Sequence, residues 1–433
     1  MRARLGMTKP PVARPANRLL AGLASLALLA GGAGCGGPGA PAAVTVRDSL
    51  GVTIVENGEA QLEQTATLGV SQGPVLSIET TEAGTFVLHE VRAVVPLPGG
   101  GWAVGNEGTG QVLLFDAEGG LVRTVGRPGE GPGELRSIAS VAPLPGDSLA
   151  VWDPTLRRLT IFDAEGRAAR EVSLGRLMEG EPWSELLPLA GGHFALAPVH
   201  SMPEGREPGV SRRASEFHRV SSTGDVVASY GSVPGHEVMV AEPAPGRVLY
   251  GPVFFGARTA AAVVGETLVV GTGESPEVRF YSPALTRVLR WPHTPLPVTE
   301  GLLEEVLEIV LAGVPEAARG PQRELFRGLP HGDTVPPYED LLVSDRGELW
   351  VGEYMGAQAA ADAGRVPSLR WLVFDGGGAL SATARTPEGF RLHAVSGGSL
   401  AGVHRDEQGL ESIRVYRLED GRPRAAPRPR PPA

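Results

Sequence analysis

The chain has one cysteine, Cys35, and one lysine, Lys9, among its 433 residues. A single thiol cannot form an internal disulfide, so the stability of the folded part must come from packing. Aromatic residues make up 5% of the chain, and acidic residues outnumber basic ones to give a net charge of -10. Proteins that bind nucleic acid present a basic face to the phosphates, so nucleic acid is not an expected partner.

The abundant residues point to β-structure instead. The 60 glycines and 39 prolines are spread along the chain, as tight turns between many short strands require. Apolar residues form 42% of the chain, which is enough for a full core. Long helices are therefore disfavoured, and disorder is not expected for most of the chain.

Residues 1–34 are predicted to be an export signal. Arginines precede an apolar run from 19 to 34, which is too short and too rich in small residues at its end to span a membrane. Cys35 follows directly, and this placement resembles the lipobox of bacterial lipoproteins, in which the cysteine is diacylated and becomes the new N-terminus. Gly32 departs from that pattern, which usually has leucine there. The alternative is ordinary cleavage that leaves Cys35 free.

The segment after the signal is predicted to be a flexible tether from Cys35 to residue 44, rich in glycine, proline and alanine. A lipid on Cys35 would anchor the protein to a bacterial membrane. Gly36 lacks the aspartate that retains lipoproteins at the inner membrane in some bacteria. We therefore expect the periplasmic face of the outer membrane. At the other end, residues 421–433 form a tail of arginine and proline that cannot pack.

Internal repeats decide the expected fold. The segment 94–120 returns as 140–167: Pro96 matches Pro143, and the FDAEG stretch at 115–119 matches the one at 162–166, both at the same offset. Weaker copies follow, to give six units between about residues 90 and 420. Each unit alternates short β-branched or apolar stretches with glycine-bearing and polar turns, which predicts four antiparallel strands.

Four-stranded units cannot bury both of their faces alone. Arranged around an axis, each unit covers its neighbour, and the sequence therefore predicts an all-β fold, a six-bladed β-propeller of four-stranded antiparallel blades over residues 45–420. The last unit has only three clear strands, so we expect an N-terminal strand, VTIVEN at 52–57, to complete it.

The repeats also resemble a known type. The patterns GxxGxGPGEL, VAPLPxDSLxVWD and RxxIFDxxG look like NHL-type repeats, and the chain from Asp48 to Leu418 resembles the six-bladed β-propeller lipoproteins of bacteria. This resemblance implies a fold and a location in the cell envelope, but no particular reaction.

One insertion interrupts the repeats between units 4 and 5, at about 299–328. Apolar residues at helical spacing follow Thr299, which predicts an N-capped helix over 299–311 lying against the propeller, and a second short helix over 316–328. A lid over the propeller and a packed excursion between blades are both compatible with this pattern, and the excursion is favoured.

The stretch GRPGEGPGEL, from Gly126 to Leu135, resembles a phosphate-binding loop only in its glycines. Such a loop leads into a helix and supplies a lysine, whereas a strand follows here and no lysine is present. We expect this stretch to connect the outer strand of blade 1 to the inner strand of blade 2.

Candidate binding residues come from aligning the blades. In propellers, this kind of connection and the loop between strands 2 and 3 open on one face, the usual ligand face. The residues that end each second strand form a predicted ring there, with other polar residues nearby. The ring is Asn106, Asp153, Pro198, Thr272, Glu353 and His404, and the neighbours include Arg127, Arg136, Glu90 and Tyr338. The alternative is that these side chains cap strand ends.

The expected function is binding of a ligand or protein partner at this face of the channel. We expect the chain to be a monomer. The runner-up is a lactonase-like hydrolase or lyase that holds calcium or zinc through Glu90, Asn106, Asp153 and Glu353. A structural subunit of an envelope complex is a third possibility. No cofactor is predicted under the binding hypothesis, and the sequence contains no serine-nucleophile or zinc-binding motif.

Overall fold

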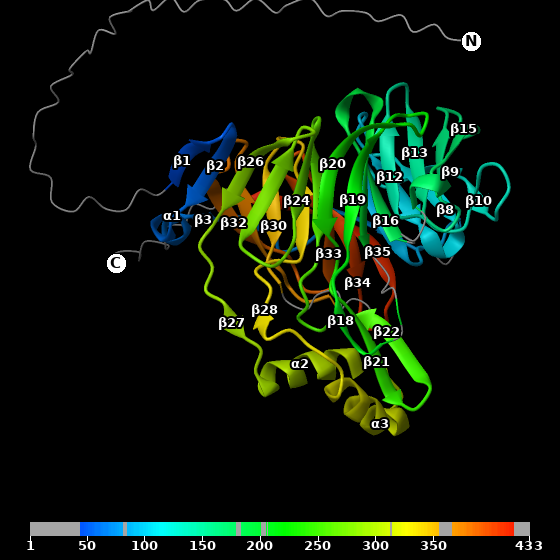
Figure 1. Cartoon of the computed structure of the whole chain (residues 1–433). Coiled ribbons are helices and arrows are strands. Elements are labelled where there is room, and N and C mark those ends of the chain that lie inside the picture. Colours follow the sequence, from blue (N-terminus) through cyan, green and yellow to red (C-terminus); the bar gives the residue numbers. More distant parts are fainter. Residues whose placement is uncertain are drawn as a thin grey trace, which may run out of the picture. The chain divides into compact units, whose positions relative to one another are not determined.

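The computed structural model describes residues 44–80, 85–178, 183–200, 205, 207–311, 314–354 and 366–419. The predicted signal (1–34), Cys35, nearly all of the tether and the tail at 421–433 lie outside these residues. Most described residues belong to short strands in small antiparallel sheets (Figure 1). None of the helices in the described segments is long and apolar enough to cross a membrane.

Six sheets in the described part of the chain contain four or more strands. We number them 1 to 6 in chain order, and in sheets 1 to 5 four strands pair antiparallel in the order of the sequence. In sheet 6 three strands do so, and the fourth is β5 from near the N-terminal end of the described residues. The strands of sheets 1 to 3 are β6 Val91–Pro96, β7 Trp102–Asn106, β8 Gln111–Phe115 and β9 Leu121–Val125; β12 Ser140–Leu144, β13 Ser148–Asp153, β14 Arg158–Phe162 and β15 Ala168–Ser173; β16 Trp183–Pro188, β17 Phe194–His200, β19 Ala214–Val220 and β20 Val226–Pro234. Those of sheets 4 to 6 are β23 Ala260–Val264, β24 Thr267–Gly271, β25 Glu277–Tyr281 and β26 Leu285–Arg290; β29 Asp340–Val343, β30 Leu349–Gly352, β31 Arg370–Phe374 and β32 Leu380–Arg385; β33 Phe390–Ser396, β34 Ser399–Arg405, β35 Glu411–Glu419 and β5 Leu76–Glu79.

The first strands of the six sheets contact one another in a closed cycle. β6 contacts β12, and the series continues through β16, β23, β29 and β33, which contacts β6 again. The first strands are therefore innermost, and the sheets are arranged about a common axis, as in a β-propeller.

Apolar side chains on both faces of the second strands explain this arrangement. On β7, Ala103 packs into a cluster shared with sheet 2, whereas Val104 packs into a cluster shared with sheet 6. On β30, Val351 faces sheet 4 and Trp350 faces sheet 6. Successive side chains of a strand point to opposite faces, so a continuous apolar run such as these requires a neighbouring sheet on each side.

The repeated FDAEG stretches form the turns between third and fourth strands. Asp116 Oδ1 accepts hydrogen bonds from the backbone N–H groups of Glu118 (3.1 Å) and Gly120 (2.7 Å). Asp163 Oδ1 does the same with Glu165 (3.1 Å) and Arg167 (2.8 Å). An aspartate that bonds the backbone two residues later stabilises a turn, so the internal repeat reflects a shared turn geometry.

The N-terminal strands differ from the prediction in one respect. Val52–Asn57 (β2) pairs in parallel with β26 at the outside of sheet 4, with β1 (Val44–Ser49) beyond it. Sheet 6 is instead completed by β5, which pairs with β35. VTIVEN was the wrong choice because its alternating pattern also suits a strand added to an already complete sheet. The short strands β3 (Ala66–Thr67) and β4 (Gly69–Val70) extend sheets 5 and 6.

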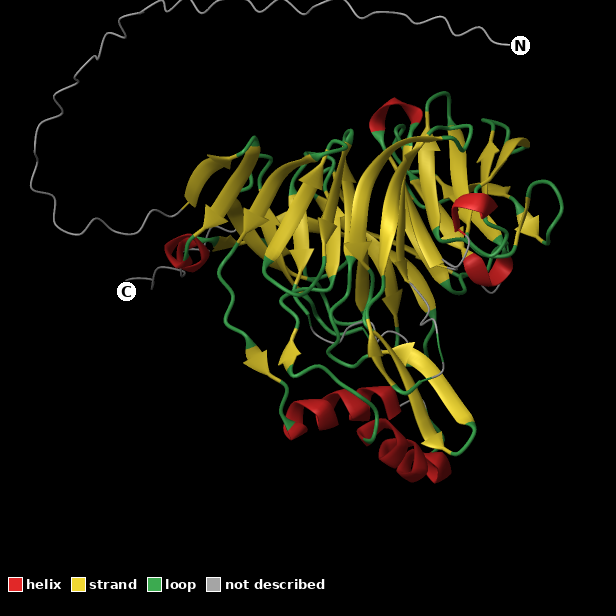
Figure 2. Cartoon of the chain, viewed as in Figure 1, coloured by secondary structure: helices red, strands yellow, loops and turns green. Residues whose placement is uncertain are grey.

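The helices predicted between units 4 and 5 are confirmed as α2 (Glu300–Leu311) and α3 (Glu316–Arg327), between sheets 4 and 5. The N–H of Leu302 donates to Thr299 Oγ1 at 3.2 Å, as expected for a capping threonine. The helix over 299–311 was expected to lie against the propeller, but among the described elements α2 packs mainly on α3. The helix α3 in turn lies near a β-hairpin, where Phe326 borders an apolar cluster with Met239 and Leu329. These parts stand outside the band of strands in Figure 2.

We call this group of elements the outer module. It comprises α2, α3, β18 Gly209–Ser211, the hairpin β21 Val238–Ala244 and β22 Arg247–Pro252, and the short pair β27 Leu296–Pro297 and β28 Thr334–Val335. In the sequence, its segments lie between β17 and β19, between β20 and β23, and between β26 and β29. All three connections leave the sheets at the end where the innermost strands begin, because antiparallel strands alternate in direction.

The remaining elements are short. They are α1 Glu59–Gln64, the 3-10 turns at Glu107–Thr109, Gly175–Met178 and Ala190–Gly192, and the parallel pair β10 Arg127–Pro128 and β11 Glu134–Leu135.

Candidate functional site

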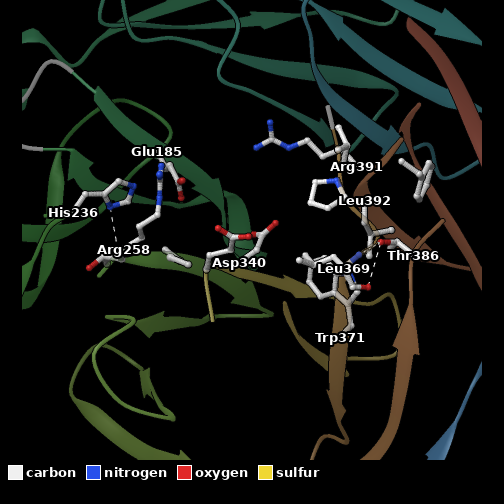
Figure 3. Close-up of a pocket in the computed structure, with 16 residues that line it drawn as sticks. Glu185, His236, Arg258, Asp340, Leu369, Trp371, Thr386, Arg391 and Leu392 are labelled. Atoms are coloured by element: carbon white, nitrogen blue, oxygen red, sulfur yellow. Dashed lines mark hydrogen bonds between the residues drawn. The ribbon is translucent and has the colours of Figure 1, made fainter. Parts of the chain in front are cut away.

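A cavity of about 220 Å³ lies at the starts of the innermost strands. Glu185 reaches it from β16, Asp340 from the first residue of β29, and Arg391 from the second residue of β33. Arg258 lies two residues before β23 and also lines the cavity. Figure 3 shows these four side chains around one space. Four sheets thus contribute charged groups to a single cavity.

The two carboxyl groups of this cavity have unusual acidities. Burial, and to a lesser extent the charge of Asp340, raises the pKa of Glu185 to about 7. Burial raises the pKa of Asp340 to about 6, although Arg391, Arg258 and a hydrogen bond from the N–H of Leu341 (2.8 Å) act in the opposite direction. Carboxylates with raised pKa values in a cavity are typical of functional sites.

A neighbouring region contains three arginines and a histidine. Burial and the charges of Arg391 and Arg92 lower the pKa of His393 to about 3, so this histidine is neutral. A second cavity of about 240 Å³ shares Arg391 and Val366 with the first and is also lined by Arg92. Glu90, Arg405 and Glu411 also line the second cavity, and Arg405 pairs with Glu411 at 2.7 Å.

The opposite wall of the first cavity is apolar. It is formed by Leu369, Trp371, Phe390 and Leu392, from sheets 5 and 6. In Figure 3, Leu369, Trp371 and Leu392 lie on the side away from Glu185. The cavity thus combines charged groups with an apolar wall that Arg391 borders (Figure 3), and apolar walls with a few polar groups are usual in small-molecule sites.

Arg212, just after β18, holds the charged side together. Its side chain is only 11% exposed and forms an ion pair with Glu274. It also donates to the carbonyl of Gly235 (2.7 Å) and to Thr259 Oγ1 (3.2 Å). The N–H of Thr259 in turn donates to Nδ1 of His236 at 3.1 Å, and both residues line the cavity. Arg212 therefore joins the loop of sheet 3 to the start of sheet 4.

The predicted ring of second-strand residues has a different location. Asn106 and Asp153 are fully buried. Asn106 accepts from the N–H of His89 (2.8 Å) and donates to the carbonyl of Val87 (2.6 Å). Asp153 accepts from the N–H groups of Arg136 (2.7 Å), Ser137 (3.2 Å) and Leu156 (2.9 Å). Both side chains cap loops at the strand ends, which is the alternative that the sequence left open.

The other members of the ring are also engaged locally or lie away from the cavity lining. Glu353 follows β30 and forms an ion pair with Arg370 at 2.8 Å, and burial raises its pKa. The carbonyl of Thr272 accepts a hydrogen bond from Arg212. His404 lies within β34, and burial lowers its pKa. Neither these three residues nor Pro198 lines the first cavity.

Tyr338, expected near the mouth of the channel, is a core residue. It is fully buried, donates to the carbonyl of Glu277 at 2.8 Å and accepts from the N–H of Gly273 at 3.1 Å. Burial is the main cause of its raised pKa. Its hydroxyl thus joins sheet 4 to the segment that enters sheet 5.

The glycine-rich stretch connects β9 to β12, from sheet 1 to sheet 2, as predicted. Arg127 pairs with Glu134 at 2.9 Å and Arg136 with Glu130 at 3.1 Å, and all four residues belong to or border this connection. Glu134 also accepts from the N–H of Gly131 at 2.8 Å. These ion pairs close the loop on itself.

Of the four residues considered for calcium or zinc, only Glu90 lines one of the two cavities. The described residues contain no group of three or more histidine, cysteine, aspartate or glutamate side chains placed to hold a metal ion. The side-chain oxygen atoms of Asn106 and Asp153 already accept hydrogen bonds from backbone N–H groups. Glu90 lines the second cavity, whereas Glu353 lines neither of the two.

The inner-strand residues were missed by the sequence analysis. A neighbouring strand in a sheet lies about 4.8 Å away, so the end of a second strand is displaced from the axis and its side chains point between sheets. The residues near the start of each first strand face the axis instead. The sequence did contain a signal for these cavity residues. Each is a charged residue beside the first apolar residues of a unit: Arg92, Glu185, Asp340 and Arg391.

Comparison with known proteins gives the fold but no family. No family model matches the chain, and no curated protein matches its sequence. A member of the DUF4221 family from Bacteroides vulgatus has a similar structure, with a TM-score of 0.51, 11% identity, and coverage of 82% of this chain and 99% of that one. This likeness supports a β-propeller fold.

Two weaker structural matches are to proteins with named activities. Virginiamycin B lyase from Staphylococcus aureus has a TM-score of 0.42 at 9% identity and covers 81% of this chain and 99% of its own. A calcium-binding protein, regucalcin, from Agrobacterium tumefaciens has a TM-score of 0.39 at 11% identity and covers 80% and 95%. Neither match carries an argument about the chemistry of this chain.

Proposed function

We propose that this chain is an exported, lipid-anchored protein with a six-bladed β-propeller that binds a small ligand in the cavity at the starts of its innermost strands. The observation that carries the proposal is the placement of Glu185 and Asp340 together in one partly apolar cavity. Both residues are half-buried, and partial removal of carboxyl groups from water costs stability. A bound ligand that interacts with them would offset that cost.

Six blades are supported by the closed cycle of contacts between first strands. Six apolar clusters, each shared by two neighbouring sheets, support the same count. A small molecule is favoured over a protein partner because the charged groups line a cavity rather than a flat surface. The lipid anchor rests on Cys35 and the apolar run before it.

A ligand screen on the exported full-length protein, purified in detergent, tests the binding function. The compounds should be small and should include cations, anions and neutral molecules, and thermal unfolding would be recorded with each. We expect at least one compound to raise the unfolding temperature by several degrees when present well above its dissociation constant.

The control is a double variant, Glu185→Gln with Asp340→Asn, alongside Glu118→Gln in the exposed turn between β8 and β9. A compound bound in the cavity should stabilise the wild type and Glu118→Gln equally and the double variant less. If no compound shifts the unfolding temperature, or if all hits stabilise the double variant as well as the wild type, this site is not the ligand site.

A further inference from the structure

The balance of charges around the first cavity restricts what it can bind, provided that the proposed ligand-binding function holds. Three carboxyl groups line it, from Glu185, Glu339 and Asp340, and two guanidinium groups, from Arg258 and Arg391. With all five ionised, the lining carries one excess negative charge. One monovalent cation would therefore neutralise the lining.

The shape of the charge distribution adds a second restriction. In Figure 3, Asp340 lies between Glu185 on one side of the cavity and Leu369, Trp371 and Leu392 on the other. A hydrated metal ion would leave the apolar wall without a partner. A ligand with a charged end and an apolar body would contact both sides.

Trp371 supplies an independent indication of a missing partner. Its side chain is 1% exposed, and its Nε1 has no hydrogen-bond acceptor within the described residues. A Cβ atom at Gly352 would lie 3.2 Å from Cη2 of Trp371 and 3.3 Å from Cβ of Asp340, so the indole lies beside this carboxylate-bearing residue. A buried indole N–H normally finds an acceptor, and a ligand with an oxygen atom near the ring would provide one.

We propose that the cavity binds a small aliphatic primary amine, with its ammonium group between Glu185 and Asp340 and its apolar body against Leu369, Phe390 and Leu392. A hydrogen-bond acceptor on the ligand would meet the indole N–H of Trp371. Arg258 and Arg391 limit the site to one ammonium group, because a second positive charge would meet them without a further carboxylate to balance it.

The binding should release protons. In the empty cavity, burial and the charge of Asp340 raise the pKa of Glu185 to about 7, so its protonated form is well populated at pH 7. An ammonium group between the carboxylates favours their ionised forms, so its arrival expels a proton to solvent. A neutral ligand would have no such effect.

A matched pair of probes tests this inference on the full-length protein. Leucinol carries an amine that is protonated at neutral pH, a hydroxyl and an isobutyl group, and 4-methylpentan-1-ol keeps the last two but lacks the amine. Isothermal titration at pH 7 in two buffers of different ionisation heat gives both affinity and proton release. We expect leucinol to bind at least tenfold more tightly than the alcohol and to release a substantial fraction of a proton.

The variants then assign the effect. Glu185→Gln with Asp340→Asn should abolish both the preference for the amine and the proton release, and Glu118→Gln should preserve them. Equal binding of the two probes, or binding of leucinol without proton release, would overturn the inference even if the variant fails to fold. If the ligand screen gives only anionic or neutral hits, the ligand-binding function stands and only the assignment of an amine is overturned. A screen without hits would overturn both.

Discussion

Glu185 on β16 and Asp340 on β29 face the same cavity although sheet 4 separates their two sheets along the chain. Only an arrangement around an axis brings the innermost strands of sheets 3 and 5 to one space. The pair is also an energetic liability, since burial raises the pKa of both carboxyl groups and the charge of Asp340 adds to the effect on Glu185. The liability can be measured.

Replacing Glu185 with glutamine should stabilise the empty protein at alkaline pH but not at acidic pH. The folded protein holds the proton of Glu185 up to about pH 7, whereas the unfolded chain loses it near pH 4.5. The folded state therefore binds more protons between these values, so its stability falls as the pH rises through that window and stays lower above it. Glutamine removes this cost.

The expected gain in unfolding free energy for Glu185→Gln is about 1 to 2 kcal/mol at pH 8 and close to zero at pH 4. The gain at pH 8 is smaller than the full pKa difference would give, because the side chain remains partly in contact with water. Denaturant unfolding at the two pH values measures it. Glu118→Gln should show no difference between the two. A gain for Glu185→Gln that is as large at pH 4 as at pH 8 would mean that its ionisation is not the cause.

Arg212 should matter to the site without touching the two acidic groups. Arg212→Met removes the ion pair with Glu274 and the hydrogen bonds to Gly235 and Thr259. The carbonyl of Thr272 also loses its bond from Arg212, whereas the carbonyl of Gly235 keeps a bond from Thr259 Oγ1. The loss of partners for part-buried polar groups costs about 1 to 3 kcal/mol, so we expect destabilisation of that size. Arg247→Met, in the exposed part of β22, is the matched control and should have little effect. Equal unfolding midpoints for the two variants would show that Arg212 does not join the loops as proposed.

Much of the fold could be predicted from the sequence because the determining signals are local. The offset of the FDAEG stretches gave the unit length, since Asp116 and Asp163 form the same turn. Thr299 marked the start of α2, because its side-chain oxygen accepts from the N–H of Leu302 only three residues later. Such signals act within a few residues, and a single sequence displays them.

The site could not be predicted in the same way because it depends on contacts between distant segments. Asn106 and Asp153 were reasonable candidates, yet each meets a loop that approaches from before its own sheet. Whether a polar side chain faces a cavity or a neighbouring backbone depends on where that loop lies. The sequence alone also could not show that β5, rather than β2, completes sheet 6.

Tyr338 should contribute to stability through its hydroxyl. Tyr338→Phe keeps the ring in the core but removes the donor to Glu277 and the acceptor for Gly273. The N–H of Gly273 would then be left without this partner, so we expect a loss of about 1 to 3 kcal/mol. Tyr250→Phe, at a position 43% exposed, should be neutral. Thermal unfolding of the two variants decides, and an unchanged midpoint for Tyr338→Phe would mean that water replaces the lost partner.

Cys35 should determine where the protein resides. If Cys35 carries the lipid, Cys35→Ser should move the protein from the membrane fraction of the envelope to the soluble fraction, because loss of the acyl chains removes about 0.8 kcal/mol of membrane affinity per buried methylene. Fractionation with metabolic labelling by a radioactive fatty acid measures both properties. Labelling of the serine variant, or its retention in the membrane, would contradict lipidation at Cys35.

Strand β5 should hold the ring of sheets closed. Ile78, on β5, is 3% exposed and packs with Val104 and Ile413 in the cluster shared by sheets 6 and 1. Ile78→Ala leaves a space there and should cost about 2 to 5 kcal/mol. The neighbouring Val75 is 53% exposed, so Val75→Ala should cost little. Hydrogen exchange should also show faster exchange across β35 in Ile78→Ala, because β35 loses support from its outer partner; uniform exchange rates in the two variants would mean that β5 adds a strand without closing the ring.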